Sequence, residues 1–165
     1  MPIYDMKTKL YFDISTWSQV NSSGNLLAKS LSPKVMYNTL PVIEIQLYNG
    51  GTTPYTGLGA GWYYYFAITN GTDPTQTPLV RVYDADIDLN PESLDVGVLR
   101  FQANCTTSQF AAAVTGNDLD SPVYCQAELQ IDTAPASSSA KPEVIMPFWL
   151  QAYNIADDRT ASDPS

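Results

Sequence analysis

The stretch LPVIEIQLY, residues 40–48, carries the clearest fold signal in this 165-residue chain. Ile43, Ile45 and Leu47 stand at every second position of it. Because a period of two places alternate side chains on opposite faces of a strand, we expect these three residues to face a core. The turn signal Asn-Gly-Gly at residues 49–51 then ends the strand. The stretch therefore predicts a half-buried β-strand.

Six other stretches have strand character on either side of it. The aromatic run that begins at Trp62 suits a strand covered on both faces. The alternation that starts at Leu79 changes character near Asp84, which indicates a bulge or a strand that leaves the core. Pro147 is expected at an edge or a bulge, because proline cannot donate to a ladder. The six expected strands are residues 9–14, 62–69, 79–89, 97–104, 123–131 and 144–155.

One short helix is expected at residues 108–114, with Thr107 or Ser108 as its cap and Gly116 as its terminator. About seven strands with one helix, and no alternation of strands with helices, predict an all-β protein, an antiparallel β-sandwich. We expect residues 1–156 to form a single domain, with a mobile loop at 133–142 and a flexible tail or linker at 157–165.

The composition narrows the function. The net charge is −9, with only 8 basic residues, so binding to nucleic acid or to an anionic membrane surface is not expected. Charged residues make up 15% of the chain, below the roughly 25% of an average protein, which suits low-charge contacts with other subunits or with sugars. We see no signal peptide and no membrane-spanning run, so synthesis in a cytoplasm is expected.

Catalytic and cofactor chemistry is not expected. The chain has no histidine, which excludes Ser-His-Asp and Cys-His arrangements. The glycine-rich residues 57–61 precede a strand and lack the ending of a phosphate-binding loop. Cys105 and Cys125 are read as buried, reduced thiols, and a disulfide between neighbouring strands stays open.

Asp84, Asp86 and Asp88 form the densest polar group, three carboxylates on one face of an expected strand. They could offer oxygen ligands to calcium, or a carboxylate pair for glycoside hydrolysis. The interpretation we favour is an exposed edge strand whose charges discourage pairing with other strands.

The aromatic cluster supplies the candidate binding residues. Its side chains could pack in the core, form a subunit interface, or offer a platform on which sugars stack. Trp149, near the end of the chain, could join either kind of surface. The interface or sugar-stacking candidates are Trp62, Tyr63, Tyr64, Tyr65 and Trp149.

The order of several short sequences resembles one group of proteins. These sequences are LYFDI at 10–14, PLV at 78–80 leading to DADI at 84–87, GVLRF at 97–101, the helix at 107–114 and YCQAEL at 124–129. Over residues 8 to 156, this order resembles phage and prophage tail structural proteins, in particular the N-terminal β-sandwich domains of baseplate upper proteins and tail-fibre adaptors. The resemblance carries no catalytic or ligand residues.

The resemblance implies a structural role in the virion tail, as a homo-oligomer, a trimer or higher, that attaches to other tail or baseplate proteins and supports host attachment. The chain would be either an anchoring module of a longer fibre protein or a small adaptor. A carbohydrate-binding module that uses exposed aromatic side chains is the alternative, with a glycan as its partner.

Overall fold

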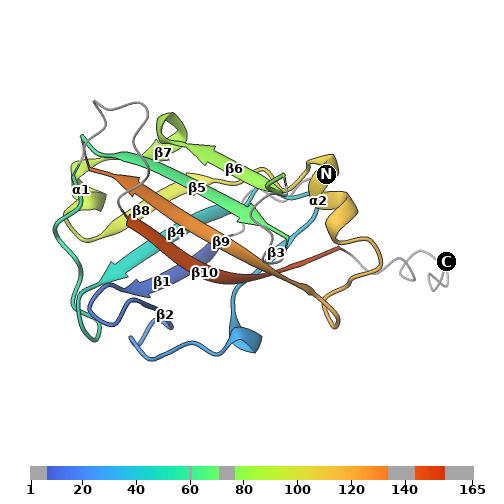
Figure 1. Cartoon of the computed structure of the whole chain (residues 1–165), viewed down its shortest axis with the longest axis horizontal. Helices are drawn as coiled ribbons and strands as arrows, with labels where there is room; N and C mark the ends of the chain where they lie inside the picture. Colours follow the sequence, from blue (N-terminus) through green and yellow to red (C-terminus); the bar gives the residue numbers. More distant parts are fainter. Residues whose placement is uncertain (1–6, 60, 71–76, 134–143, 155–165) are drawn as a thin grey trace.

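A computed structural model describes residues 7–59, 61–70, 77–133 and 144–154, and it shows two five-stranded β-sheets packed face to face (Figure 1). Sheet A has the strand order β2-β1-β4-β8-β7, and sheet B has the order β3-β10-β9-β5-β6. The predicted all-β, sandwich-like fold is confirmed. The strands of sheet A are β2 (Ser18–Val20), β1 (Lys7–Asp13), β4 (Val42–Tyr48), β8 (Val98–Gln102) and β7 (Ile87–Asp88), and those of sheet B are β3 (Lys34–Met36), β10 (Val144–Tyr153), β9 (Val123–Asp132), β5 (Tyr63–Thr69) and β6 (Val80–Tyr83).

Two details of the predicted sandwich are wrong. The described residues form ten strands, and not about seven. Strands β2 and β3 are only three residues long and show no measurable periodicity, and the expected strand 79–89 is divided into β6 and β7. The sheets are also mixed, since β1 runs parallel to β4 and β3 runs parallel to β10. Parallel neighbours need a long connection, and here the chain between β1 and β4 passes through β2 in sheet A and β3 in sheet B.

The chain crosses between the sheets where the alternation changes near Asp84. Strand β6 ends at Tyr83 in sheet B, the 3-10 turn η2 (Asp84–Asp86) follows, and β7 then pairs with β8 in sheet A. Of the two possibilities that the sequence left open, a strand that leaves its layer is the one observed.

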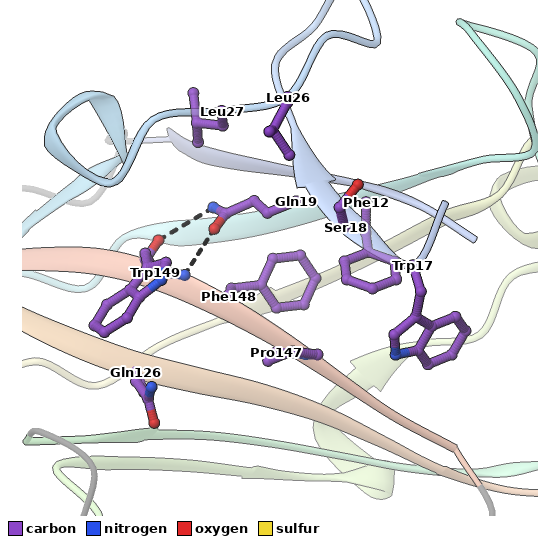
Figure 2. Close-up of a pocket in the computed structure, with 10 residues that line it drawn as sticks. All are labelled: Phe12, Trp17, Ser18, Gln19, Leu26, Leu27, Gln126, Pro147, Phe148 and Trp149. Carbon is purple, nitrogen blue, oxygen red and sulfur yellow. Dashed lines mark hydrogen bonds between the residues drawn. The ribbon is translucent and has the colours of Figure 1, made fainter. Parts of the chain in front are cut away.

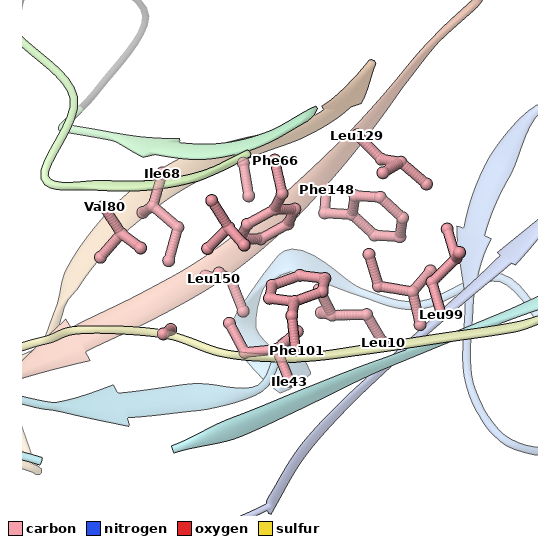
Figure 3. Packing of buried hydrophobic residues seen from close by; sticks show 14 of the residues in the cluster. Leu10, Ile43, Phe66, Ile68, Val80, Leu99, Phe101, Leu129, Phe148 and Leu150 are labelled. Atoms are coloured by element: carbon pink, nitrogen blue, oxygen red, sulfur yellow. The ribbon is translucent and has the colours of Figure 1, made fainter. Parts of the chain in front are cut away.

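One hydrophobic cluster lies between the sheets (Figure 3). Ile43, Ile45 and Leu47 are fully buried in it, as the alternation predicts. Phe66 of sheet B lies against Phe101 of sheet A, with ring centroids 4.8 Å apart. Burying each such side chain contributes about 1.5–3 kcal/mol, so the cluster as a whole holds the two sheets together.

Two short α-helices join the strands in the described residues. Helix α2 (Ser108–Ala113) is the predicted one, and its N-cap is Thr107, whose hydroxyl oxygen accepts the N–H of Phe110 at 3.1 Å. Helix α1 (Pro91–Leu94) was not predicted, although Asn90 as a cap before a proline is a recognised start signal. A third short turn, the 3-10 helix η1 (Lys29–Leu31), precedes β3.

The two cysteines are buried and carry free thiols, so the alternative of a disulfide between them does not hold in this structure. Burial raises the pKa of each thiol to about 12. Both side chains therefore act as small apolar core residues. The predicted tail at 157–165 lies outside the described residues, as does all but the first residue of the predicted loop at 133–142.

Candidate functional site

The outer face of sheet A matches its own charges. Strand register places Lys9 beside Glu44, Glu44 beside Arg100, and Arg100 beside Asp88. Arg100 donates from Nη2 to Oε2 of Glu44 at 2.9 Å and lies 3.9 Å from Asp88. Because positive and negative charges alternate across four strands, the charges of this face are paired within the molecule. The face therefore offers little driving force for binding a partner.

The outer face of sheet B is different, and we call it the aromatic face. Register places Ile145, Gln130, Tyr65 and Tyr83 side by side across four strands. The rings of Tyr65 and Tyr83 lie 5.3 Å apart at 50°. Large hydrophobic side chains are rarely exposed together in a monomer without a functional reason. The aromatic face consists of Tyr63, Tyr65, Tyr83, Tyr124, Ile145 and Trp149.

The structure separates the five aromatic residues predicted from the sequence. Tyr63 is 45% exposed, and Tyr65 lies on the same outer face. Tyr64 points inward, is fully buried, and donates from its hydroxyl to the carbonyl of Gly59 at 2.9 Å. Burial raises the pKa of Tyr64 well above its usual range, and the nearby Asp84 raises it further. The expectation that this strand is covered on both faces is therefore wrong.

Trp62 belongs to neither surface. It is partly buried against the core just before β5, with Gly59 tight against its indole ring. A Cβ atom on Gly59 would lie 2.7 Å from the indole nitrogen, so the glycine makes room for the ring. The glycine-rich residues that precede β5 thus have a packing role in this structure.

Trp149 is held from two directions. The Lys29 ammonium lies 4.1 Å from the centre of its ring and 4.6 Å from that of Tyr124, a cation–π arrangement. The side-chain amide of Gln19 donates to the Trp149 carbonyl at 3.1 Å and accepts its N–H at 2.7 Å (Figure 2). Gln19 therefore joins the edge of sheet A to sheet B as a strand backbone would.

Beside this bridge lies a groove of about 250 Å³, which we call the side groove (Figure 2). It lies between β2 and β10, the strands that Gln19 connects. Trp17 is 47% exposed and has a φ of 54°, an unusual backbone conformation for a bulky residue. The lining residues are Phe12, Trp17, Ser18, Gln19, Leu26, Leu27, Gln126, Pro147, Phe148 and Trp149.

Pro147 marks the edge of sheet B at this groove. Strand β3 pairs with β10 only at Gln151–Tyr153, which leaves the earlier part of β10 without a β3 partner in the described residues. The N–H groups of Trp149 and Gln151 both point to that side, toward Gln19 and Pro33 respectively. Pro147, two residues earlier, places its missing N–H there as well, so the predicted edge position is confirmed.

Asp13 fixes the turn that carries Trp17. Its carboxylate is buried and accepts the Ser15 hydroxyl at 2.7 Å, the Ser15 N–H at 2.9 Å and the Gly50 N–H at 3.0 Å. The Ser15 hydroxyl, followed by these backbone N–H groups, holds the pKa of Asp13 below its usual value.

We expect Asp13→Asn to lower the free energy of unfolding by about 1–3 kcal/mol at neutral pH, because an amide is a weaker acceptor for three donors. A depressed pKa stabilises the fold above the pKa of a free aspartate, about 3.9, and the contribution is lost as the pH falls through the folded value. Urea unfolding should therefore show the two proteins converging in acid. Asp120→Asn, on an exposed loop, is the control and should change stability by less than about 0.5 kcal/mol at either pH. A difference in free energy of unfolding between wild type and Asp13→Asn that stays constant at all pH values would contradict the role given to the Asp13 carboxylate.

The three aspartates predicted as a possible calcium site do not share one face of a strand. Asp84 lies in η2 and accepts the Tyr64 N–H at 3.0 Å. Asp88 lies in β7, where it accepts the Asn90 N–H at 2.9 Å and neighbours Arg100. Within the part of the chain that the structure describes, no group of three or more His, Cys, Asp or Glu side chains could hold a metal ion. The favoured interpretation, an edge position, fits β7, which ends sheet A.

Sequence reasoning missed several surface residues. Tyr83 and Tyr124 alternate with buried neighbours in β6 and β9, so the period of two could have placed them beside Tyr65. Trp17 and Leu26 lie in or beside loops, and no sequence pattern brings them to the edge of sheet B.

Comparison with models of known protein families and with curated proteins finds no match to this chain. Among the described residues there is also no helix with the length and apolar character needed to span a bilayer.

Proposed function

We propose that this chain is a non-enzymatic structural module of a phage tail or tail-like particle, made in the bacterial cytoplasm and carried in the virion tail. It attaches to a neighbouring baseplate or fibre protein through the aromatic face. The observation that carries this proposal is the contrast between the two outer faces. Sheet A matches its charges within itself, whereas sheet B exposes Tyr83 and Ile145 at the two ends of a four-strand row that contains no charged residue.

The composition of the aromatic face suits protein contact. Tyrosines bury large areas with little loss of side-chain freedom and are enriched in the centres of interfaces. Glu128, Ala67 and Arg81 form the adjacent row, with opposite charges on either side of a small residue. A partner can therefore pack on rings at the centre and pair charges beside them.

The variant Tyr63→Ser/Tyr83→Ser tests this surface. Expressed in the bacterium that encodes the chain, the wild-type protein is expected to sediment with purified tail particles, and the variant to be recovered there at least about tenfold less, because central interface tyrosines often contribute 2 kcal/mol or more. Leu119→Ser, which removes an exposed hydrophobic residue from another loop, is the matched control and should sediment like the wild type. Circular dichroism confirms that each variant is folded. Equal recovery of all three proteins would contradict the proposed surface.

Carbohydrate binding is the second candidate, and the adjacent rings of Tyr65 and Tyr83 favour it. A sugar would stack on the exposed Tyr83 ring and the half-buried Tyr65 ring beside it, whereas the Trp149 ring has the Lys29 ammonium over it. A glycan array separates the candidates. The sugar-binding module would be favoured if the wild type binds a specific glycan and does not associate with particles. The variant Tyr63→Ser/Tyr83→Ser should then lose the glycan binding.

A further inference from the structure

Charge is segregated along this chain in two blocks of opposite sign. Residues 14–43 contain Lys29 and Lys34 and no acidic residue. Residues 82–99 contain five acidic residues and no basic one. The five are Asp84, Asp86, Asp88, Glu92 and Asp95.

The fold places these blocks on opposite sides of the sandwich (Figure 1). Strands β2 and β3 end the two sheets on one side, and β7 and β6 end them on the other. We call the first the basic side, with η1 beside it, and the second the acidic side, with η2 and α1. Arg81 of β6 also lies on the acidic side, where the five carboxylates outnumber it. Asp88 already lies 3.9 Å from Arg100 within the molecule. Because opposite edges of a sandwich cannot meet within one molecule, the lysines of one edge can pair with the carboxylates of the other only between molecules.

The basic side also exposes apolar surface. Leu26 is 77% exposed and Leu31 is 73% exposed, and the side groove with Trp17 opens next to them. A second hollow of about 230 Å³, lined in part by Lys9 and Leu31, lies on the same side. The acidic side carries a matching apolar residue, Val96, which is 48% exposed just after α1. Each side of the sandwich therefore combines exposed apolar surface with charge. The charges are lysines on the basic side and carboxylates on the acidic side.

From these observations we propose that the chain self-associates head to tail, with the basic side of one copy on the acidic side of the next. The proposal rests on the proposed assembly function and names the partner as a second copy of this chain. A head-to-tail contact uses two different patches, so it closes into a ring when the rotation allows. That geometry uses the edges of the two sheets and leaves the middle of the aromatic face, at Tyr63, Tyr65 and Ile145, free for a different tail protein.

Charge reversal gives a test that depends on the direction of the contact. The full chain is expected to show concentration-dependent mass in sedimentation velocity, and salt near 1 M, where the Debye length is about 3 Å, should weaken the association. The basic-side variant Lys29→Glu/Lys34→Glu and the acidic-side variant Asp86→Lys/Glu92→Lys/Asp95→Lys should each associate at least about 100-fold more weakly alone, because like charges then meet.

Mixing the two variants is the decisive step. In a head-to-tail contact, the reversed basic side of one variant matches the reversed acidic side of the other, and the unchanged sides also match. The mixture should therefore regain the wild-type mass with the two chains alternating, a result that misfolded chains could not give. Two further variants that change the net charge equally provide a matched control: Lys29→Gln/Lys34→Gln should weaken association, and Gln102→Glu/Gln109→Glu, on neither side, should not.

Three outcomes would overturn the proposal: a chain that stays monomeric up to its solubility limit, variants that associate like the wild type, or variants that lose association and are not rescued by mixing. A monomer that still sediments with tail particles would overturn this self-association while leaving the proposed function standing.

Discussion

Replacing Phe148 with alanine is expected to lower the free energy of unfolding by about 3–5 kcal/mol. Phe148 is 2% exposed, and its ring lies 5.5 Å from that of Phe12. Phe12 in turn meets the edge of Trp17, at 5.1 Å and 87°. The three rings run from the core to the surface beneath the side groove, so a cavity at Phe148 removes support from the whole series.

Chemical denaturation followed by circular dichroism measures this loss. The control is Ile145→Thr, three residues earlier on the exposed face of the same strand, where we expect a change within about 0.5 kcal/mol because the side chain stays β-branched and exposed. Phe148→Ala should also reduce the difference in Trp17 fluorescence between the folded and the unfolded protein. A loss below about 1 kcal/mol for Phe148→Ala would show that the two sheets do not pack as described.

Gly97→Ala is expected to be strongly destabilising for a different reason. Gly97 has a φ of 74°, and a Cβ atom there would lie 2.6 Å from the Tyr55 carbonyl oxygen and 2.8 Å from that of Leu47. Both are backbone atoms, which cannot move aside without disturbing β4. The Gly97 carbonyl also accepts the Leu47 N–H at 2.8 Å, so the start of β8 would be displaced from its neighbour.

Gly116→Ala separates the cost of the positive φ from the cost of the steric contact. Gly116 has a similar φ of 77°, but a Cβ atom there would meet nothing within 4 Å. Gly116→Ala should therefore lower the free energy of unfolding only by the cost of placing an alanine in the left-handed conformation, about 1–2 kcal/mol. Gly97→Ala should lose about 1–3 kcal/mol more, the usual range for overpacking. Equal losses in urea denaturation would mean that the contact with β4 is looser than described.

The sequence was most informative where a strand is long and covered on one face. Ile43, Ile45 and Leu47 showed their burial through the period of two alone. The aromatic run gave the opposite result: Tyr64 is buried while Tyr63 is exposed, although the two residues are chemically identical. Only the pairing of β5 with β9 and β6 decides which tyrosine faces outward.

Features that depend on distant contacts could not be predicted from the sequence. The parallel pairing of β1 with β4 and the bridge from Gln19 to Trp149 join residues far apart in the chain. Gln151 is a similar case: it is buried in β10, and its amide donates to the carbonyls of Ser30 and Ser32. A buried glutamine has no signature in a strand pattern, because its partners come from a loop.

The candidate surface was predicted only in part. Tyr63, Tyr65 and Trp149 lie on the outer face of sheet B, whereas Tyr64 and Trp62 serve the core. The aspartates looked like one group because the sequence placed them in one strand, and the turn η2 separates them. Local alternation predicts faces, but it does not predict where a chain changes sheet.

If this chain is a structural component of a tail particle, as we propose, it must be found in purified tail particles. Tail particles purified from the bacterium that encodes the chain would be analysed by quantitative mass spectrometry and by electron microscopy with a labelled antibody. We expect a fixed ratio of this chain to the other tail proteins and antibody label at the tail. Particles with intact tails that lack the chain, in cells where it remains in the soluble fraction, would contradict it.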